Sequence, residues 1–453
     1  MKIIVVGSGG REHAIAYKLA ESASVTEILC VPGNGGTATE TKCRNINPKD
    51  IPATQELPLT EAVVAIAQAE QVDFVVVGPE DPLADGIADK LWRVGVPVVG
   101  PKAKDAALEA SKDLSKQFMT KYGVACAASA TFTDADAALS YIAEKGAPIV
   151  VKADGLAAGK GGLVAKTLEE AKAAVHELME EGKVGKAGKK LVIEEYLQGV
   201  EISVLAAVSV TPASATDGKA AIVPFLPARD HKRLLDGALG PNTGGMGAVC
   251  PLSDVTDETM RQFNERILEP TLRGMVAEQM DYRGFIFFGL MLTKDGPKCL
   301  EYNVRLGDPE TQAVLPMLDA DFAALCKAIL DDKGALKDFP LRWKSGFQVA
   351  PVVVSGGYPA SYKKGLPITI DAAAVAASGA KVFIAGAIEE RRGAKDSEAT
   401  TLVTSGGRVL AASAHGATFD EAWNSAYAAI KALQFEGMQY RTDIGLPGAA
   451  ESN

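Results

Sequence analysis

The chain has 453 residues, 47% of them hydrophobic and 23% charged, a composition typical of about three globular domains that excludes a disordered or fibrous protein. Its 47 Lys and Arg against 57 Asp and Glu give a net charge of −10, which argues against a nucleic-acid partner but allows a local cationic pocket. No apolar segment reaches membrane-spanning length, and six cysteines without a CxxC pair predict reduced thiols and a cytoplasmic location.

Residues 1–101 alternate strand and helix signals. The apolar runs KIIVV, EILCV and DFVVV are separated by GREHAIAYKLAES and ELPLTEAVVAIAQAEQ, which have helical spacing. Buried strands alternating with helices predict a parallel α/β domain with ligands at the carboxyl ends of its strands. The turns GSGG, PGNGG and GPEDP follow those strands.

Residues 102–199 predict a second unit, with a helix over DAALEASKDLSKQFMTKYG and strands at APIVVK, LVAK and KLVIEEYL. In residues 200–332, four strand signals and one long helix, DETMRQFNERILEPTLRGMVAEQ, predict an antiparallel α+β unit with TPASATDGKA as a surface hairpin loop. Residues 333–440 predict a small β-rich domain closed by the helix FDEAWNSAYAAIKALQ. Residues 441–453 form a tail, disordered at PGAAESN.

The turn GSGGREHA follows a strand and opens a helix, a place where backbone amides attract anions. Gly7 and Gly9 match the dinucleotide fingerprint, but Glu12 occupies its third glycine site and the second strand lacks the acidic residue that holds a ribose. NAD is therefore disfavoured, and two interpretations stay open: a site for a smaller phosphate ligand, or a tight turn without a ligand.

The loop ADGLAAGKGG follows Lys152 and contains Gly159 and Gly161, but its spacing does not fit a Walker A loop. It is either a mobile cover over nucleotide phosphates or a surface hairpin. The segment KLVIEEYLQGVE places Glu194 and Glu201 near a strand end, where they meet an adenine edge and a ribose or form a solvated edge strand.

In KCLEYNVRLGDPE, Glu301, Asn303 and Arg305 alternate along one strand face. Two hard oxygen ligands suit Mg²⁺, and an arginine beside the metal suits phosphoryl transfer, whereas an exposed alternating strand is the structural alternative. In ARDHKR, Asp230, Lys232 and Arg233 predict a site for a phosphate or a zwitterion, and His231 is either part of it or solvated.

Eight motifs occur in the order found in phosphoribosylamine–glycine ligases, also called glycinamide ribonucleotide synthetases, and the chain resembles this ATP-grasp family to about Gln434. They are GSGGREHA, PGNGGT, VGPEDPL, KADGLAAGKGG, VIEEYL, ARDHKR, GPNTGGMGA and EYNVRLGDPET. The resemblance implies an ATP-grasp fold with ATP between two antiparallel sheets. It implies a ligase of purine biosynthesis that joins glycine to 5-phosphoribosylamine through glycyl phosphate, using ATP with Mg²⁺ or Mn²⁺. A monomer with transient contacts to neighbouring purine enzymes is expected.

The resemblance also implies roles for single residues. Those for ATP are Lys112, Lys152, Gly159, Gly161, Glu194, Tyr196, Leu197 and Glu201, with Glu301 and Asn303 on the metal. Those for the substrates are Gly9, Gly10, Arg11, Asn34, Gly36, Thr37, Glu80, Asp230, Lys232, Gly244, Gly245, Arg305 and Asp308. Arg305, Lys152 and Asp230 are the catalytic candidates, with Arg305 and Asp230 placing glycine.

Three residues depart from the family pattern near the expected substrate pocket: Ala238, Leu239 and Leu306. Two other functions remain alternatives. One is an ATP-grasp ligase for a different acid and amine, and the other is a catalytically silent nucleotide-binding regulator. The second would have lost a phosphate or metal residue, but Lys152, Glu301 and Arg305 are all retained.

Overall fold

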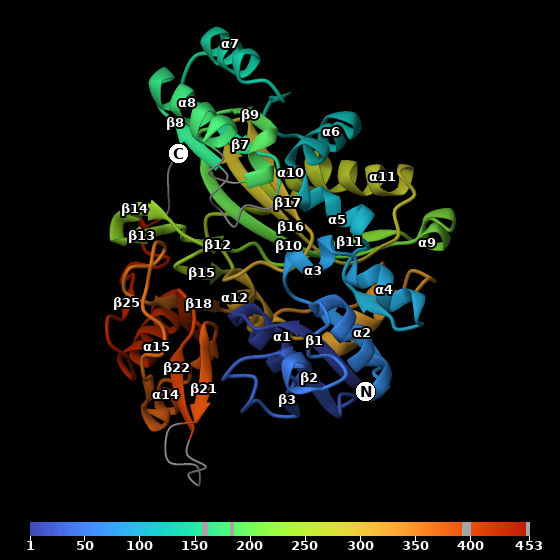
Figure 1. The fold of residues 1–453 in the computed structure, drawn as a ribbon, viewed down its shortest axis with the longest axis vertical. Coiled ribbons are helices and arrows are strands. Elements are labelled where there is room, and N and C mark those ends of the chain that lie inside the picture. Colours follow the sequence, from blue (N-terminus) through green and yellow to red (C-terminus); the bar gives the residue numbers. More distant parts are fainter. Residues whose placement is uncertain (156–161, 182–184, 392–399, 450–453) are drawn as a thin grey trace.

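The computed structural model describes residues 1–155, 162–181, 185–391 and 400–449 (Figure 1). A five-stranded parallel sheet of order β3-β2-β1-β4-β5 forms the N-terminal part. Residues 3–6 of its central strand are fully buried, as a continuous apolar run predicts for a parallel sheet. Its elements are β1 (Lys2–Gly7), α1 (Gly10–Ala20), β2 (Glu27–Pro32), β3 (Cys43–Asn45), η1 (Pro48–Asp50), α2 (Leu59–Glu70), β4 (Phe74–Val77), α3 (Glu80–Ala84), α4 (Ile87–Arg93) and β5 (Val98–Val99).

A four-stranded antiparallel sheet of order β6-β9-β7-β8 forms a separate lobe at the top of Figure 1. Its strand β9 is interior, so the interpretation of KLVIEEYL as a solvated edge strand is wrong. The elements leading to and through this lobe are α5 (Ala103–Ala110), α6 (Lys112–Tyr122), β6 (Ser129–Phe132), α7 (Ala135–Lys145), β7 (Ile149–Ala153), β8 (Gly162–Ala165), α8 (Leu168–Val175), η2 (His176–Glu180), η3 (Gly185–Lys189) and β9 (Leu191–Glu195).

A second antiparallel sheet, of order β11-β10-β16-β17, lies below that lobe. The mixed α/β and α+β class is thereby confirmed, and the two antiparallel sheets agree with the predicted ATP-grasp fold. The elements here are β10 (Val200–Val210), α9 (Pro212–Thr216), β11 (Ala221–Pro224), α10 (Asp257–Phe263), η5 (Asn264–Leu268), α11 (Glu269–Ala277), β16 (Tyr282–Thr293), β17 (Gly296–Asn303), α12 (Glu310–Met317) and α13 (Phe322–Leu330).

The C-terminal sheet recruits strands from the preceding region. Its order is β12-β15-β18-β23-β20, with β25 also paired to β18, so the strands at residues 229–230 and 247–250 extend a sheet that mostly comes from beyond residue 346. Three two-stranded sheets, β13-β14, β19-β24 and β21-β22, accompany it. The elements of this region are β12 (Arg229–Asp230), β13 (Arg233–Leu235), η4 (Asp236–Ala238), β14 (Leu239–Asn242), β15 (Gly247–Cys250), β18 (Phe347–Val354), β19 (Thr369–Ile370), α14 (Ala372–Ser378), β20 (Lys381–Ile384), β21 (Ala387–Arg391), β22 (Thr400–Thr404), β23 (Arg408–Gly416), α15 (Phe419–Lys431), β24 (Leu433–Gln434) and β25 (Gln439–Tyr440).

The structure refines two helical predictions and one loop prediction. The helix predicted over DAALEASKDLSKQFMTKYG breaks at Ser111, whose hydroxyl caps α6 by accepting from the amide of Leu114. The long helix after residue 256 contains the π-helical turn η5 just before Pro270, which lacks the amide needed for a regular helical bond. The loop predicted over TPASATDGKA includes helix α9, whose capping box joins Thr211 and Ser214.

The predicted tail is packed over its described part. Arg441 is 1% exposed, and its guanidinium contacts Asp443 and the carbonyl of Ala449, which is itself buried. The prediction of disorder from Pro447 onward is therefore wrong for residues 447–449. None of the helices within the described ranges combines the length and the apolarity needed to cross a bilayer.

Candidate functional site

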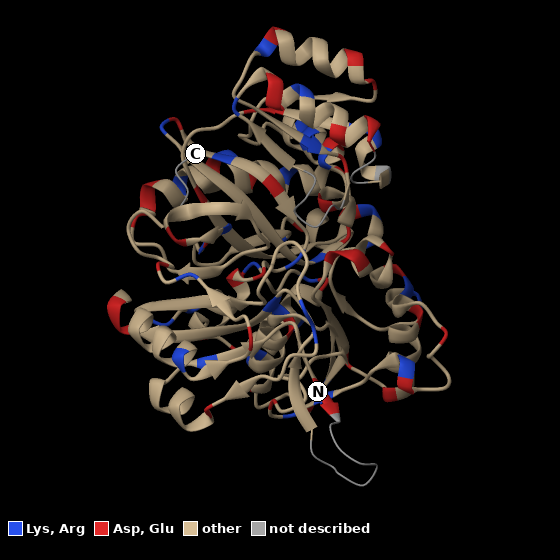
Figure 2. Ribbon diagram, turned by 60° about the vertical axis from the view of Figure 1, so that its left-hand side comes forward, with Lys and Arg blue, Asp and Glu red and all other residues tan. Residues whose placement is uncertain are grey.

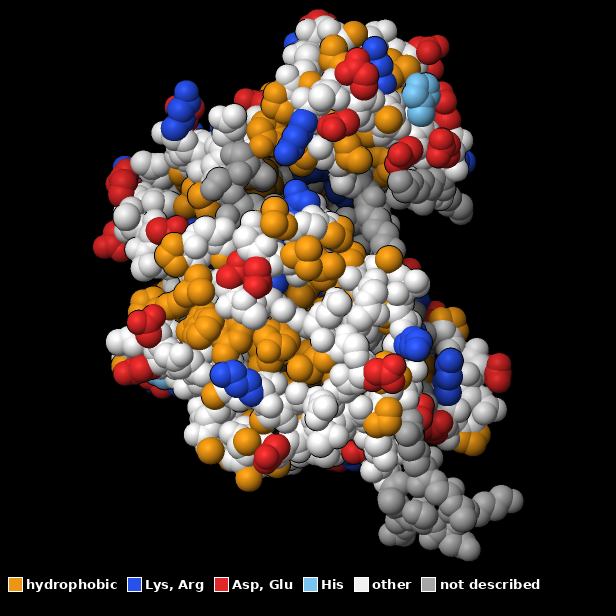
Figure 3. Space-filling view, turned by 90° about the vertical axis from the view of Figure 1, so that its left-hand side faces the viewer, with side chains coloured by type: hydrophobic (Ala, Val, Ile, Leu, Met, Phe, Trp, Pro, Cys, Tyr) orange, Lys and Arg blue, Asp and Glu red, His pale blue; other side chains and the backbone are white. Residues whose placement is uncertain are grey.

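A hollow separates the lobe of β6–β9 from the rest of the molecule, and Lys or Arg side chains are visible in it (Figure 3). Elsewhere Lys, Arg, Asp and Glu alternate along the ribbon and do not gather on one face (Figure 2). The cations in the hollow are thus a local feature of an acidic chain, as the sequence predicts.

Lys152, at the end of β7, points toward the neighbouring strand β9. Its Nζ lies 3.0 Å from Oε1 of Glu194, and the Nζ of Lys116 lies 3.0 Å from Oε2 of the same carboxylate. Burial alone would raise the pKa of Glu194, but the charges of Lys152 and Lys116 hold it below its ordinary value. The sequence analysis missed Lys116, which sits one helical turn after Lys112 on α6.

Glu301 lies on β17, opposite Gly289 of β16. A Cβ at Gly289 would lie 3.2 Å from Cγ of Glu301, so the glycine leaves room for the carboxylate. Burial alone would raise the pKa of Glu301, yet nearby cations hold it below its ordinary value. In order of decreasing effect these cations are Lys232, Lys152, Lys112 and Arg305. The fold therefore brings these predicted residues together.

The donors of Glu301 and Asn303 fit a hard divalent cation. Asn303 Oδ1 accepts from Nη2 of Arg305 at 3.3 Å and keeps a second lone pair for a metal. Within the described ranges no group of three or more His, Cys, Asp or Glu side chains has the arrangement of a metal site. A Mg²⁺ or Mn²⁺ ion here would take its remaining ligands from phosphates and water, which is the usual mode for Mg²⁺ in nucleotide sites.

Arg305 also joins the central region to the N-terminal domain. Its Nε lies 3.2 Å from Oε2 of Glu80, and its Nη2 lies 2.9 Å from Oε1 of Glu109. Burial would raise the pKa of Glu80, but Arg305 and Arg11 hold it below its ordinary value. Glu109, which the sequence analysis missed, also accepts from the amide of Val304 at 2.7 Å.

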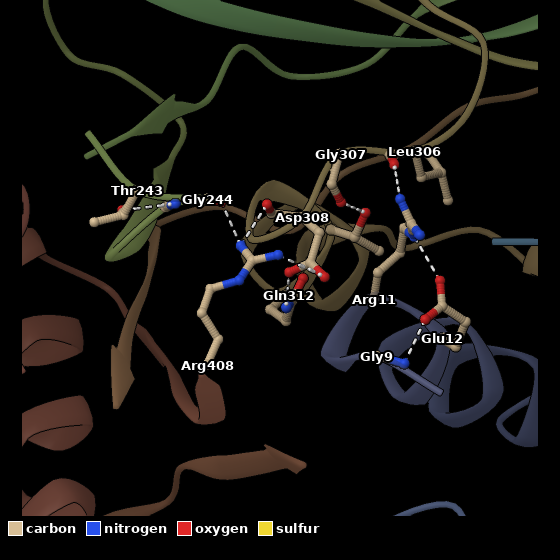
Figure 4. A network of polar contacts seen from close by, with 12 residues as sticks. Gly9, Arg11, Glu12, Thr243, Gly244, Leu306, Gly307, Asp308, Gln312 and Arg408 are labelled. Atoms are coloured by element: carbon tan, nitrogen blue, oxygen red, sulfur yellow. Dashed lines mark hydrogen bonds and ion pairs between the residues drawn. The ribbon is translucent and has the colours of Figure 1, made fainter. Parts of the chain in front are cut away.

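The turn after β1 holds a carboxylate from its own helix. Glu12 accepts from the amide of Gly9 and from Nε of Arg11, both at 2.5 Å (Figure 4). Its side chain fills the space beside Gly7 and Gly78, where an added Cβ would approach within 2.6 Å and 2.0 Å respectively. The Gly9 amide, which was predicted to meet an external anion, thus donates to Glu12. Glu12 stands at the third glycine site of the dinucleotide fingerprint, so its place in this turn is a structural reason against NAD.

A cavity of about 530 Å³ opens beside this turn, at the carboxyl ends of β1, β2 and β4. It is lined by predicted residues such as Gly9, Arg11 and Asp308, and by Thr60 and Asp81, which the sequence analysis missed. Gly36 packs against the ring of His13, whereas Asn34 and Thr37 are buried. Asn34 Oδ1 accepts from the amide of Gly36, its Nδ2 donates to the carbonyls of Ser8 and Ile384, and Thr37 donates to Asn45. The side chains of Asn34 and Thr37 shape the loop, and their direct contact with substrate stays a prediction.

Asp230 on β12 has an unusual environment. Its Oδ1 is buried and has no hydrogen-bond partner among the residues that the structure describes. Burial, and then the charge of Glu310, raise its pKa well above the ordinary value. Gly245 has a φ of +116° and lies so close that a Cβ would be 2.7 Å from Oδ1 of Asp230. Two adjacent buried carboxyl groups favour a bound cation.

Three models of the phosphoribosylglycinamide synthetase family match the chain: the N domain at residues 1–109, the ATP-grasp (A) domain at residues 110–311 and the C domain at residues 348–447. The chain belongs to the phosphoribosylglycinamide synthetase family. The family resemblance drawn from the motif order is thereby confirmed. Domain limits at residues 101, 199 and 332 stay predictions.

Named relatives match this synthetase-family chain along almost its whole length. A phosphoribosylamine–glycine ligase of Clostridium acetobutylicum is 47% identical, covering 98% of this chain and 99% of the relative, and one of Nostoc sp. is 45% identical with the same coverage. The crystal structure of such a ligase from Thermotoga maritima is 32% identical with a TM-score of 0.78, covering 98% of this chain and 100% of that one. The biotin carboxylase domain of Hydrogenobacter thermophilus 2-oxoglutarate carboxylase shares the fold at 15% identity and a TM-score of 0.64, with coverages of 97% and 91%.

The remaining predicted residues of this family member divide into three groups. Lys112 donates to the carbonyl of Gly155 at 3.0 Å, and Lys232 pairs with Glu201. Tyr196 and Leu197 follow β9 directly, and Gly10 begins α1, where an added Cβ would lie 2.7 Å from Nε2 of Gln312. Gly159 and Gly161, with most of the predicted lid, lie outside the described residues.

One interpretation of a single residue changes, and the three departures from the family pattern can be located. His231 is not solvated but 3% exposed: its Nδ1 faces the carbonyl of Gly247 at 3.2 Å, and its Nε2 accepts from the amide of Gly445 at 3.0 Å. Leu306 is buried, and its backbone carbonyl accepts from Arg11 and Arg305. Ala238 and Leu239 lie on the β13–β14 hairpin, where Leu239 is 63% exposed.

Proposed function

We propose that the chain catalyses the ATP-dependent ligation of glycine to 5-phosphoribosylamine, giving glycinamide ribonucleotide, ADP and phosphate in purine biosynthesis. The family membership and full-length relatives support this reaction. The observation within the site that carries it is the buried, unpartnered Oδ1 of Asp230 beside Glu310, near the cations around Glu301. A small zwitterion has an ammonium that suits the carboxyl groups of Asp230 and Glu310, and a carboxylate that suits the cations around Glu301.

The reaction needs an activated acid because oxide is a poor leaving group. A glycine carboxylate oxygen attacks the γ-phosphorus of ATP, the bond to the β-phosphate oxygen breaks, and ADP leaves. The amine nitrogen of phosphoribosylamine then attacks the carbonyl of glycyl phosphate, and inorganic phosphate leaves with the former carboxylate oxygen. The amine loses a proton as the amide forms. The reaction passes through an acyl phosphate, so no enzyme nucleophile is needed, and none is among the proposed roles.

The residues proposed for ATP come from α6, from β7 and β9 of one antiparallel sheet, and from β10 of the other. Lys152 and Lys112 are proposed to meet the phosphates, with Glu194, Tyr196 and Leu197 on adenine and Glu201 on the ribose. Because Lys152 and Glu201 already have ionic partners, ATP binding would exchange or share these contacts. Glu301 and Asn303 would hold Mg²⁺ or Mn²⁺, which would offset phosphate charge when bound.

The two other substrates are proposed to meet beside Arg305. Asp230 would hold the ammonium of glycine, and Arg305 would orient its carboxylate. The cavity next to Gly9 and Arg11 would hold phosphoribosylamine, with Glu80 on the sugar. Arg305 bonds Glu80 directly, so the two substrate positions share one ionic network.

An ADP-release assay with each substrate omitted in turn tests the proposal. The complete mixture of ATP, Mg²⁺, glycine and freshly generated phosphoribosylamine should release ADP and form glycinamide ribonucleotide. Each omission should reduce release to background. ADP release that needs a different acid or amine would instead favour another ATP-grasp ligase, and no release under any condition would favour a silent nucleotide-binding protein.

A further inference from the structure

Arg408 stands at the start of β23 in the C-terminal sheet and reaches out of that sheet. Its Nη1 donates to the carbonyl of Gly244 at 2.5 Å and to the carbonyl of Asp308 at 2.7 Å (Figure 4). Its Nη2 lies 3.2 Å from the carboxylate Oδ2 of Asp308. One guanidinium thus contacts two loops whose residues belong to the proposed substrate site.

Gly244 is held on both of its backbone groups by the C-terminal sheet region. Its amide donates to the hydroxyl of Tyr358 at 2.8 Å, while its carbonyl accepts from Arg408. A Cβ at Gly244 would lie 3.1 Å from that hydroxyl and 3.4 Å from Cζ of Arg408. The absence of a side chain at this position therefore permits the close approach of both partners.

The loop of residues 243–247 carries this restraint to Asp230. The amide of Gly245 donates to Oγ1 of Thr243 at 3.0 Å, and Thr243 in turn bonds the carbonyl of Lys232. Gly245 lies directly against Asp230, whose Oδ1 is buried and unpartnered among the described residues. A shift at Gly244 would therefore alter the walls around the proposed ammonium site.

The other contacts of Arg408 hold Asp308 at the border of the cavity beside Gly9. Asp308 lines the cavity beside Gly9, and its Oδ1 accepts from Nε2 of Gln312 at 2.8 Å. The carbonyl of Gln312 accepts from Oγ of Ser413, five residues after Arg408 on β23. Asp308 is thereby held by β23, the same strand that holds the loop of residues 243–247.

We propose that Arg408 and Tyr358 are positioning residues for the ligation, setting the loop of residues 243–247 over Asp230 and the carboxylate of Asp308 beside it. This inference rests on the proposed function, because it identifies the site over Asp230 as the glycine site. The two side chains act through Gly244 and Asp308 and are not assigned a contact with the reacting atoms.

Steady-state kinetics of Arg408→Met test the inference. The KM for glycine should rise by about tenfold or more, while the KM for ATP changes by less than about twofold, since misplacement affects the loop and not the nucleotide lobe. Arg408→Lys should recover part of the loss, because one ammonium can reach a carbonyl but cannot bridge both loops. Arg261→Met, at an exposed arginine of α10, is the matched control and should leave all three KM values unchanged.

Tyr358→Phe provides a second, milder variant that removes one oxygen. It should raise the KM for glycine in the same direction, and its effect combined with Arg408→Met should be smaller than the product of the two single effects, since both hold Gly244. If Arg408→Met does not fold, Arg408→Lys and Tyr358→Phe decide the question by the same split between KM values.

The outcomes separate this inference from the proposed function. The wild-type chain must first show ADP release that requires glycine and phosphoribosylamine, and failure there rejects the proposed function. If the wild type meets that requirement but the variants lower only the thermal midpoint, or weaken ATP and glycine equally, Arg408 and Tyr358 are structural and the inference is overturned.

Discussion

Lys152 Nζ lies 3.0 Å from Glu194 Oε1, so the lysine proposed for ATP phosphate already has a buried carboxylate as its partner. Lys116 contacts the other oxygen of that carboxylate, and Glu194 is only 3% exposed. The triad joins α6, β7 and β9 and fixes the direction in which Lys152 extends. The charge proposed to meet ATP is therefore held in place before a nucleotide arrives.

Glu194→Gln should lower the free energy of unfolding by about 3–5 kcal/mol, because it leaves two largely buried ammonium groups without their carboxylate. Urea denaturation measures this change. Glu278→Gln is the matched control, since Glu278 pairs with Lys121 on the surface, where an ion pair contributes little. Equal destabilisation by the two variants would show that the Glu194 triad adds no stability of its own.

Glu301→Ala should reduce Mg²⁺-dependent turnover by at least about 100-fold, because it removes the proposed carboxylate ligand of the metal. The circular dichroism spectrum should stay that of the folded wild type. Glu258→Ala, at an exposed glutamate of α10, serves as the control. Near-normal turnover of the Glu301 variant at all Mg²⁺ concentrations would refute the metal assignment.

Arg11→Ala should raise the KM for phosphoribosylamine more than the KM for ATP. Arg11 lines the cavity beside Gly9, whose lining includes none of the residues proposed for ATP, and it contacts Leu306 and Glu12. Arg44→Ala, which removes a half-exposed arginine of the same domain, should change neither constant. Equal weakening of both substrates by the Arg11 variant would count against a separate site in the N-terminal domain.

His231 should make stability fall on mild acidification. Burial, and then the charge of Arg441, lower its pKa from 6.5 to about 4 in the folded chain. The unfolded chain therefore binds the proton more readily between these values, so the stabilising contribution present above pH 6.5 is lost as pH falls toward 4. Between pH 7 and pH 5 the loss is about 2 kcal/mol. Urea denaturation of wild type and His231→Gln at both pH values measures it, and a wild-type pH dependence no steeper than that of the variant would contradict it.

The sequence indicated the motifs and most of the elements because their signals are local. Apolar runs predicted β1, β2 and β4, and the alternation of Glu301, Asn303 and Arg305 predicted a shared face near a nucleotide. Local signals were less useful where the backbone deviates from regular geometry. Ser111 divides a predicted helix, and a π-helical turn precedes Pro270, since capping and the missing proline amide decide these points.

The sequence by itself determined the family, the parallel and antiparallel parts of the fold, and the identity of the polar residues that the chemistry requires. Only the tertiary structure decided which charges meet: Lys116 and Lys152 on Glu194, Arg305 on Glu80, and Arg408 on Asp308, 100 residues away. The physical reason is range. Helix and strand patterns depend on neighbours within a few residues, whereas ionic and buried polar contacts depend on distances through space that only the packed domains define.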